Sequence, residues 1–370
     1  MATDLEVFGD TVNHRPPARV LYYAGFTPDL LKRMGQHIGV LPADALAIPD
    51  GMDVQAALAE HYGMWRFARL PIRRPDSQPA KDYSRYWHGR QLREGTTFNS
   101  MGVAMVPSGF YHFWGYVSPL SDAEGLKDIE DYPLDDYSTW DFSYMAAEAR
   151  AAHAAGRVVN TFCGHMYENA WQIRGYEQFL MDMIERPAWA ECLLERLHQN
   201  ALVLAKALAA AGVDLLGTGD DVANQNALMF SPEIWRRMIL PRWARVWQAA
   251  KAINPAVRIW YHTDGNAMAI IEEMVQAGLD MLNPLQPECL DVDEVYRRWG
   301  GRLCLDGCIG TQSTMPWGTP RQVRARVKEV IEKFGRQGGL IVSPTHTLEP
   351  EVPIANIEAM FEACREFGTA

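Results

Sequence analysis

The sequence predicts an α/β barrel of the TIM type, with eight parallel strands joined by helical crossovers. Short apolar runs that end in glycine, proline or polar residues alternate with longer stretches that carry apolar residues at a three-to-four spacing. Such alternation is typical of parallel strands and crossover helices. Three of the apolar runs also end in His or Asp side chains, and the carboxyl ends of barrel strands are where the residues of an active site lie.

The elements follow from this pattern in chain order. The predicted strands are residues 19–24, 64–70, 157–163, 214–219, 258–262, 280–283, 302–306 and 339–343. The predicted helices include residues 187–211, 233–253, 267–277, 320–334 and 354–367. Ser231 before a proline, and Thr319 before a proline with Gln322 at the capping-box position, are typical helix starts.

The interval between the second and third strands is too long for a simple crossover. Residues 101–106 and 110–117 are expected to pair around Pro107-Ser-Gly109 as a hairpin, because a long structureless gap is uncommon in a compact domain. The aromatic residues of this interval are candidates to cover the barrel mouth: Phe110, Tyr111, Phe113, Trp114 and Tyr116. We therefore expect one domain over residues 1–370, with an insertion at about 71–156.

The composition favours a small-molecule partner. The chain has 370 residues, 48% of them hydrophobic and 22% charged, which is ordinary for a globular protein. With 35 basic and 46 acidic residues the net charge is -11, which argues against binding to nucleic acid or to an anionic membrane. The six cysteines form no CxxC pair, and eighteen apolar residues never run together. We expect a cytoplasmic protein with reduced thiols and no membrane segment.

The segment from Arg258 to Asn266 is the most informative for chemistry. It is an apolar run that ends in His262 and Asp264 before a glycine. Because strand side chains alternate between faces, both residues are expected on the same side, where they could bind a metal or a proton. His346 follows the last predicted strand in the same way. The alternative is that these side chains form hydrogen bonds that orient the barrel rim.

Paired carboxylates follow the fourth strand at Asp220 and Asp221. Two neighbouring acids in a dry pocket must differ in pKa, so one is expected to pair with a donor and the other, which we take as Asp221, to act as base or ligand. The alternative is that one caps a helix and the other pairs with Arg174 or Arg242. Gln225 is a candidate to position substrate or water.

The third strand offers further candidates at its end, where His165 and Glu168 are predicted to contact substrate. Cys163 is more typical of a buried small side chain than of a nucleophile. In the seventh strand, the period of two places Asp306 and Cys308 on one face, so Cys308 could add a sulfur ligand if that face lines the cleft. Asp306 would then be a buried acid that needs a partner.

Taken in order, several segments resemble the uroporphyrinogen decarboxylase superfamily, which includes corrinoid-linked methyltransferases. The segments are Ala170-Trp-Gln-Ile-Arg174-Gly175, Gly219-Asp-Asp221, His262-Thr-Asp-Gly-Asn266, Gly278-Leu-Asp280-Met-Leu-Asn283-Pro-Leu-Gln286, Ile309-Gly-Thr311-Gln312 and Pro344-Thr-His346. The likeness implies a distorted eight-stranded barrel with the cleft at the carboxyl ends of the strands. Arg174, Asn283 and Tyr22 are candidates to bind substrate. The likeness also implies a possible homodimer.

This chain differs from each branch of that superfamily, and the differences limit the functions that are expected of it. The decarboxylases of the heme pathway carry an arginine-rich segment after the first strand, whereas this chain has Tyr22-Tyr-Ala-Gly25, so uroporphyrinogen is not the expected substrate. The zinc methyltransferases carry His-x-Cys at the fifth strand end and a cysteine at the eighth. Here Asp264 and His346 replace the two cysteines beside His262. That set can bind Zn²⁺, or a harder metal such as Fe²⁺ or Mn²⁺.

The sequence therefore leads to one leading hypothesis and two alternatives. The first is a metal-dependent methyltransferase or demethylase that acts on a small O-, N- or S-methyl substrate, with Zn²⁺ as the metal and a corrinoid, bound to a corrinoid protein, as the methyl acceptor. The second is a metal-independent decarboxylase or related lyase of a small carboxylate. The third is a ligand-binding barrel without catalysis.

Overall fold

The computed structural model describes residues 2–109 and 113–369. In that part of the chain, eight parallel strands form a curled sheet in the order β1-β11-β10-β9-β8-β7-β6-β2. These strands are β1 (Leu21–Tyr22), β2 (Phe67–Ala68), β6 (Val158–His165), β7 (Leu215–Gly219), β8 (Arg258–His262), β9 (Met281–Leu285), β10 (Cys304–Ile309) and β11 (Leu340–Pro344). The predicted α/β barrel and its eight strands are confirmed. A backbone hydrogen bond from Trp65 N to Tyr22 O connects the two edges of the sheet.

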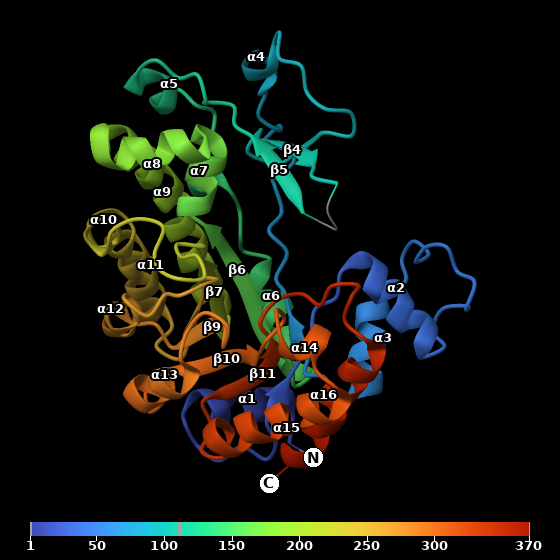
Figure 1. The fold of residues 1–370 in the computed structure, drawn as a ribbon. Coiled ribbons are helices and arrows are strands. Elements are labelled where there is room, and N and C mark those ends of the chain that lie inside the picture. Colours follow the sequence, from blue (N-terminus) through green and yellow to red (C-terminus); the bar gives the residue numbers. More distant parts are fainter. Residues whose placement is uncertain (1, 110–112, 370) are drawn as a thin grey trace.

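Helices cover the outer face of this sheet (Figure 1). The helices of the described residues, of which α4 stands apart from the sheet and α1 lies at one end of it, are α1 (Asp4–Val12), α2 (Pro28–His37), α3 (Val54–Tyr62), α4 (Ser84–Trp87), α5 (Leu126–Glu130), α6 (Met145–Ala154), α7 (Tyr167–Arg174), α8 (Tyr176–Glu185), α9 (Pro187–Ala211), α10 (Pro232–Met238), α11 (Leu240–Ile253), α12 (Ile271–Ala277), α13 (Val292–Trp299), α14 (Thr314–Trp317), α15 (Pro320–Val330) and α16 (Ile354–Phe367). Short 3₁₀ and π turns span Tyr137–Thr139 and Ile331–Gly335.

Local sequence signals explain where the helices begin. The Ser231 side chain accepts a hydrogen bond from Ile234 N at the start of α10, and Thr319 and Gln322 form the predicted capping box at the start of α15. The predicted helix 233–253 is two helices, because α11 begins anew with Pro241 in its first turn. A proline lacks the N–H that a continuous helix would need.

The segment between β2 and β6 contains a small antiparallel sheet. Its strands are β3 (Thr97–Phe98), β4 (Ala104–Pro107) and β5 (Trp114–Val117), so the predicted hairpin gains a third strand. Figure 1 shows this sheet beyond the carboxyl end of β6, near α7. The ring of Tyr116 packs edge-on against Trp171 of α7. Phe110 and Tyr111 lie outside the described residues.

Helix α1, which the sequence pattern did not reveal, closes the amino-terminal end of the barrel. Its Val7, Phe8 and Val12 pack against residues at the starts of the strands. Those residues are Leu21, Trp65, Val158, Leu215, Met281, Cys304 and Ile341. Because this apolar layer fills one end of the barrel, a cavity inside it can open only toward the carboxyl ends of the strands.

Helix α9 contains a buried histidine, and its burial predicts that the fold loses stability in acid. His198 is fully buried, and neither ring nitrogen has a hydrogen-bond partner in the described part of the chain. Burial, together with the charge of Arg245, lowers the pKa of His198 from 6.5 to about 4. The unfolded chain therefore binds the extra proton more readily than the folded protein between these two pH values, so stability falls as the pH drops through that range.

We expect His198→Leu to remove this loss. At pH 5 the buried imidazole costs about 2 kcal/mol of unfolding free energy relative to pH 7. Urea unfolding gives the unfolding free energy at pH 7 and at pH 5. The drop in this free energy between the two pH values should be smaller in the variant than in the parent by this amount. His37→Leu, at a half-exposed pair with Glu358, is the control. An unchanged pH dependence in His198→Leu would show that other groups cause the acid sensitivity.

Candidate active site at the carboxyl ends of the strands

A cavity of about 410 Å³ opens inside the barrel above the apolar layer. Its size suits a small-molecule ligand. Aromatic side chains form much of its wall, and polar side chains from several strands reach into it. The aromatic residues are Tyr23, Trp65, Phe67, Phe162 and Trp260, and the polar ones include Arg69, His165, His262, Asn283, Asp306 and His346.

His262 lines the cavity and lies close to two carboxylates, Asp221 and Asp264, which are not part of the lining. The nearest possible ligand atoms of these three residues all lie within 4.8 Å of one another. His262 ends β8, and Asp221 follows β7, the neighbouring strand. The Asp221 carboxylate accepts a hydrogen bond of 2.8 Å from the backbone N–H of Asp264, which ties the two strand ends together.

The hydrogen bonds of His262 define which of its nitrogens is available. Its Nδ1 lies 2.7 Å from Asn283 Oδ1, and an amide oxygen can only accept. Nδ1 therefore carries a proton, and in the neutral ring the Nε2 lone pair faces Asp221 Oδ1 at 3.6 Å. A neutral imidazole in this orientation is suited to bind a metal ion or to accept a proton.

The carboxyl group of Asp264 has one oxygen that meets no hydrogen-bond donor in the described part of the chain. This oxygen, Oδ1, is also buried. Burial and the nearby Asp221 raise the pKa of Asp264, while His262 opposes that shift. Two adjacent carboxylates, one of them with an unsatisfied buried oxygen, and an imidazole form a donor set that fits a divalent cation.

The turn that carries Asp264 depends on the next residue. Gly265 has a φ of +83°, and a Cβ at this position would lie 2.4 Å from Asn224 O. Its backbone N–H donates to Gln286 Oε1 at 3.0 Å. Only glycine combines this backbone conformation with such close contact to the loop after β7, so Gly265 fixes the direction in which Asp264 points.

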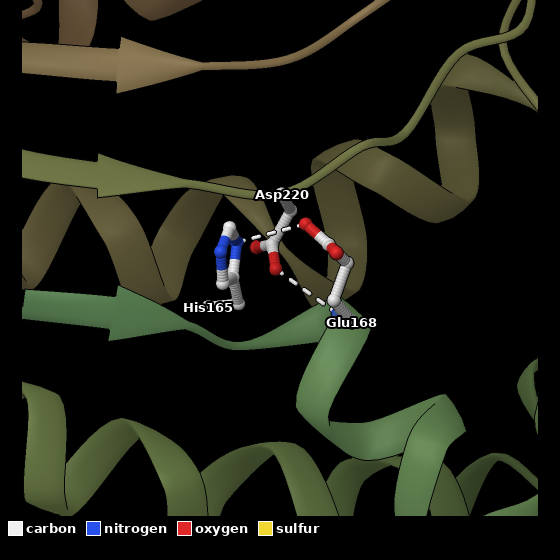
Figure 2. A group of neighbouring side chains, drawn as sticks. All are labelled: His165, Glu168 and Asp220. Atoms are coloured by element: carbon white, nitrogen blue, oxygen red, sulfur yellow. Dashed lines mark hydrogen bonds and ion pairs between the residues drawn. The ribbon is translucent and has the colours of Figure 1, made fainter. Parts of the chain in front are cut away.

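A second group, His165, Glu168 and Asp220, lies beside the first (Figure 2). Glu168 Oε1 contacts His165 Nδ1 at 2.8 Å and accepts the Asp221 backbone N–H at 3.0 Å. Burial opposes a charge on His165, but Glu168 prevails and raises the pKa of His165 to about 9. His165 is thus a protonated donor that lines the cavity.

Both Phe162 and His165 reach the cavity although they are three residues apart. A regular strand would place them on opposite faces. The pairing of β6 with β7 shifts between these two residues, and Gly164 within the shift has a φ of +114°. This bulge redirects the end of the strand, as bulges near active sites commonly do.

Asp220 and Asp221 take the different roles that their adjacency predicted. Asp220 is fully buried and accepts from Met166 N at 2.7 Å, Glu168 N at 3.1 Å and Trp243 Nε1 at 2.7 Å. It therefore caps the start of α7 and joins it to α11, and burial raises its pKa to about 7. Asp221 is half-exposed and remains the acid available for chemistry.

Cys308 does not belong to the ligand set that the strand period suggested. The register of β10 against β9 shifts at Leu305 and Gly307, and Cys308 has a φ of +73°. The bulge leaves Asp306 in the cavity but turns Cys308 into the apolar layer between the sheet and the helices. There, burial raises its pKa to about 12. A buried protonated thiol outside the cavity is not a ligand.

Three predicted substrate contacts also need correction. Tyr22 points outward and donates to Tyr62 O at 2.8 Å, while Tyr23 lines the cavity in its place. Arg174 is buried in an ion pair with Asp182. Gln225 is exposed, donates to Gln312 Oε1 and lies outside the cavity lining. Asn283 does line the cavity, but its amide oxygen is occupied by His262.

Most of the aromatic wall of the cavity could not be predicted from the sequence. Phe67 begins a two-residue strand, Trp65 shortly precedes it, and Tyr23 follows another such strand. In so short a strand, alternation cannot show which residue faces inward. Only Trp260 could have been found, because it stands two residues before His262 in a regular strand and so shares its face.

A parallel α/β barrel with a polar cavity at the carboxyl ends of its strands is the architecture of barrel enzymes. The chain belongs to the uroporphyrinogen decarboxylase (URO-D) family, whose sequence profile matches residues 103–367. Known members of this family are enzymes, either decarboxylases or methyltransferases.

Individual relatives include both activities. A uroporphyrinogen decarboxylase of Methylococcus capsulatus is 27% identical over 192 residues, which is 51% of this chain and 51% of that protein. The methylcobamide:CoM methyltransferase MtaA of Methanosarcina barkeri is 24% identical over 192 residues, or 52% of this chain and 53% of that protein. The chain thus matches about half the length of these curated relatives.

A solved structure is similar over nearly the whole chain. A methyltransferase from Methanosarcina mazei superposes with a TM-score of 0.66 at 18% identity and covers 99% of both chains. This likeness supports the fold. In the described part of this chain, no helix combines the length and apolar character needed to cross a bilayer.

Proposed function

We propose that this protein is a metal-dependent methyltransferase or demethylase that acts on a small O-, N- or S-methyl substrate. The observation that carries the proposal is the buried Asp264 Oδ1, which has no hydrogen-bond partner among the described residues and lies beside Asp221 and the cavity-lining His262. A divalent cation, with Zn²⁺ as the first choice, would be held by His262, Asp264 and Asp221, with His346 from the same cavity as a further ligand.

The bound metal would supply a Lewis acid that polarises the heteroatom carrying the methyl group. His262 Nε2 is oriented toward the metal position by the hydrogen bond at Nδ1. The protonated His165, which lines the cavity, can donate a proton to the heteroatom as it leaves. The aromatic walls limit the water that reaches the methyl group.

The cavity is also consistent with the corrinoid-linked branch of the family. A corrinoid protein is the proposed methyl acceptor; the similar protein MtaA, named a methylcobamide:CoM methyltransferase, supports only the more general point that a corrinoid takes part in methyl transfer in this family. Among the described residues that line the cavity, Arg69 is the one Arg or Lys. A substrate with many carboxylates, such as uroporphyrinogen, would meet too few cations there.

A second candidate is a lyase that removes carbon dioxide from a small carboxylate. Two observations favour it: Arg69 can pair with a carboxylate, and His165 is a proton donor in the same cavity. In such a reaction His165 would protonate the carbon left behind, and the reaction would need no metal. The two candidates therefore differ in whether the metal site is required.

The test begins with elemental analysis of the purified parent protein. We expect about one equivalent of a divalent metal per chain. The protein is then incubated with reduced cobalamin and panels of methoxy, methylamino and methylthio compounds, and methylcobalamin is followed by absorbance while released carbon dioxide is measured in parallel. Methylcobalamin formation that chelation abolishes is the expected result. A folded, metal-free protein that releases carbon dioxide would overturn the proposal in favour of the lyase.

A further inference from the structure

Asp306 lies in the cavity at the centre of a hydrogen-bond network that the proposed chemistry does not use directly. The side chain is 3% exposed and receives donors from three parts of the sheet. Trp260 Nε1 and the Tyr23 hydroxyl donate to its Oδ2 at 2.8 and 3.1 Å, and the Ser343 hydroxyl donates to Oδ1 at 3.1 Å. A buried carboxylate with three donors is held in one position.

Two of these donors, Tyr23 and Trp260, connect Asp306 to His262. The Tyr23 hydroxyl lies 3.4 Å from Asn283 Nδ2, and the same amide contacts His262 Nδ1 through its oxygen at 2.7 Å. The Trp260 ring, fixed by Asp306, stacks on the His262 ring with centroids 5.8 Å apart and an interplanar angle of 17°. Asp306 therefore reaches His262 by two routes.

The hydrogen bonds of the first route can run in only one direction. A carboxylate only accepts, so the Tyr23 hydroxyl donates to Asp306 and its oxygen is left to accept from the Asn283 amide nitrogen. That contact turns the Asn283 oxygen toward His262, whose Nδ1 must then carry the proton. In the neutral His262 ring the lone pair is therefore on Nε2, which faces Asp221.

We propose that Asp306 is a positioning residue that sets the tautomer and ring plane of His262 through Tyr23, Asn283 and Trp260. It does so from outside the proposed ligand set, in the way that such partners orient metal-binding histidines. The inference rests on the proposed function for the role of Nε2. The tautomer itself belongs to the metal-free protein and can be measured there.

The variants are chosen to separate polarity from packing. Tyr23→Phe removes the hydroxyl between Asp306 and Asn283 while it keeps the ring. Asp306→Leu removes the acceptors, whereas Asp306→Asn can still accept from Tyr23 and Trp260 and donate to the Ser343 hydroxyl. Tyr22→Phe is the matched control, because the neighbouring Tyr22 loses a hydroxyl that bonds Tyr62 O on the outer side of the barrel.

The measurement is the ¹⁵N spectrum of histidine side chains in metal-free protein at pH 8, with His262 assigned from His262→Gln. We expect an Nδ1–H tautomer in the parent, Tyr22→Phe and Asp306→Asn, and a shift toward Nε2–H in Tyr23→Phe and Asp306→Leu. Zn²⁺ should bind about tenfold more weakly to the last two. Tyr23→Phe keeps the test valid if Asp306→Leu does not fold.

The outcomes distinguish this inference from the proposed function. An Nε2–H tautomer in the parent, or a tautomer that Tyr23→Phe leaves unchanged, would overturn the positioning role even if the parent binds metal. The expected tautomer shift in a parent that binds no Zn²⁺ would support the role of Asp306 and refute the metal-dependent reaction instead.

Discussion

Replacing His262 with alanine is expected to abolish tight metal binding. The parent should retain about one equivalent after dialysis, whereas the variant should retain essentially none. The imidazole is the neutral donor of the Asp221–His262–Asp264 group, and its Nε2 already faces Asp221. Loss of a partner outside the ligand set typically costs 10- to 100-fold in metal affinity, so loss of a ligand should cost more than ~100-fold.

His346→Ala extends the same experiment to the second histidine of the cavity. If His346 is a ligand, its removal should also lower the metal content, although Asp221, His262 and Asp264 remain. His37→Ala is the control, because His37 pairs with Glu358 on the outer surface. Elemental analysis of all four proteins in the same buffer is the measurement. Full metal content in His262→Ala would contradict the proposed site.

The metal contents would also show whether residues at the ends of strands are enough to predict a metal site. The eight strands could be located from the sequence because apolar runs and glycine or polar boundaries mark them locally. His262 and Asp264 could be placed together because β8 is regular up to its last residue. In both cases a few consecutive residues are enough for the prediction, and no contact with a distant part of the chain has to be known.

The remaining features depend on contacts that the local sequence does not encode. Cys308 does not face the cavity, as regular alternation would require, because a bulge intervenes. Tyr23 lines the cavity in place of Tyr22, and a two-residue strand is too short for alternation to show which of them faces inward. The division of labour between Asp220 and Asp221 depends on N–H groups of α7 and the indole of Trp243. These partners lie 23 to 54 residues away in sequence, so the choice of Asp221 as the available acid could be made from the sequence but the groups that hold Asp220 could not be named.

Arg174 shows how a family motif can mark stability instead of substrate binding. Its Nε contacts Asp182 Oδ2 at 2.7 Å, and its Nη1 donates to the backbone oxygens of Leu120 and Ser121 at 2.7 and 3.1 Å. The two charged side chains are only 4% and 3% exposed. The guanidinium thus joins α7 and α8 to the end of the segment that carries β3–β5.

Arg174→Met is therefore expected to destabilise the fold by about 3–5 kcal/mol, because it removes the buried counter-ion of Asp182 and leaves only the half-exposed Arg186 at 3.9 Å. Urea unfolding measures the loss. Arg297→Met, in a pair with Glu294 whose arginine is 71% exposed, should cost less than about 1 kcal/mol. Folded Arg174→Met should keep the metal content of the parent. If Arg174 instead bound substrate, the variant would unfold like the parent but lose ligand binding.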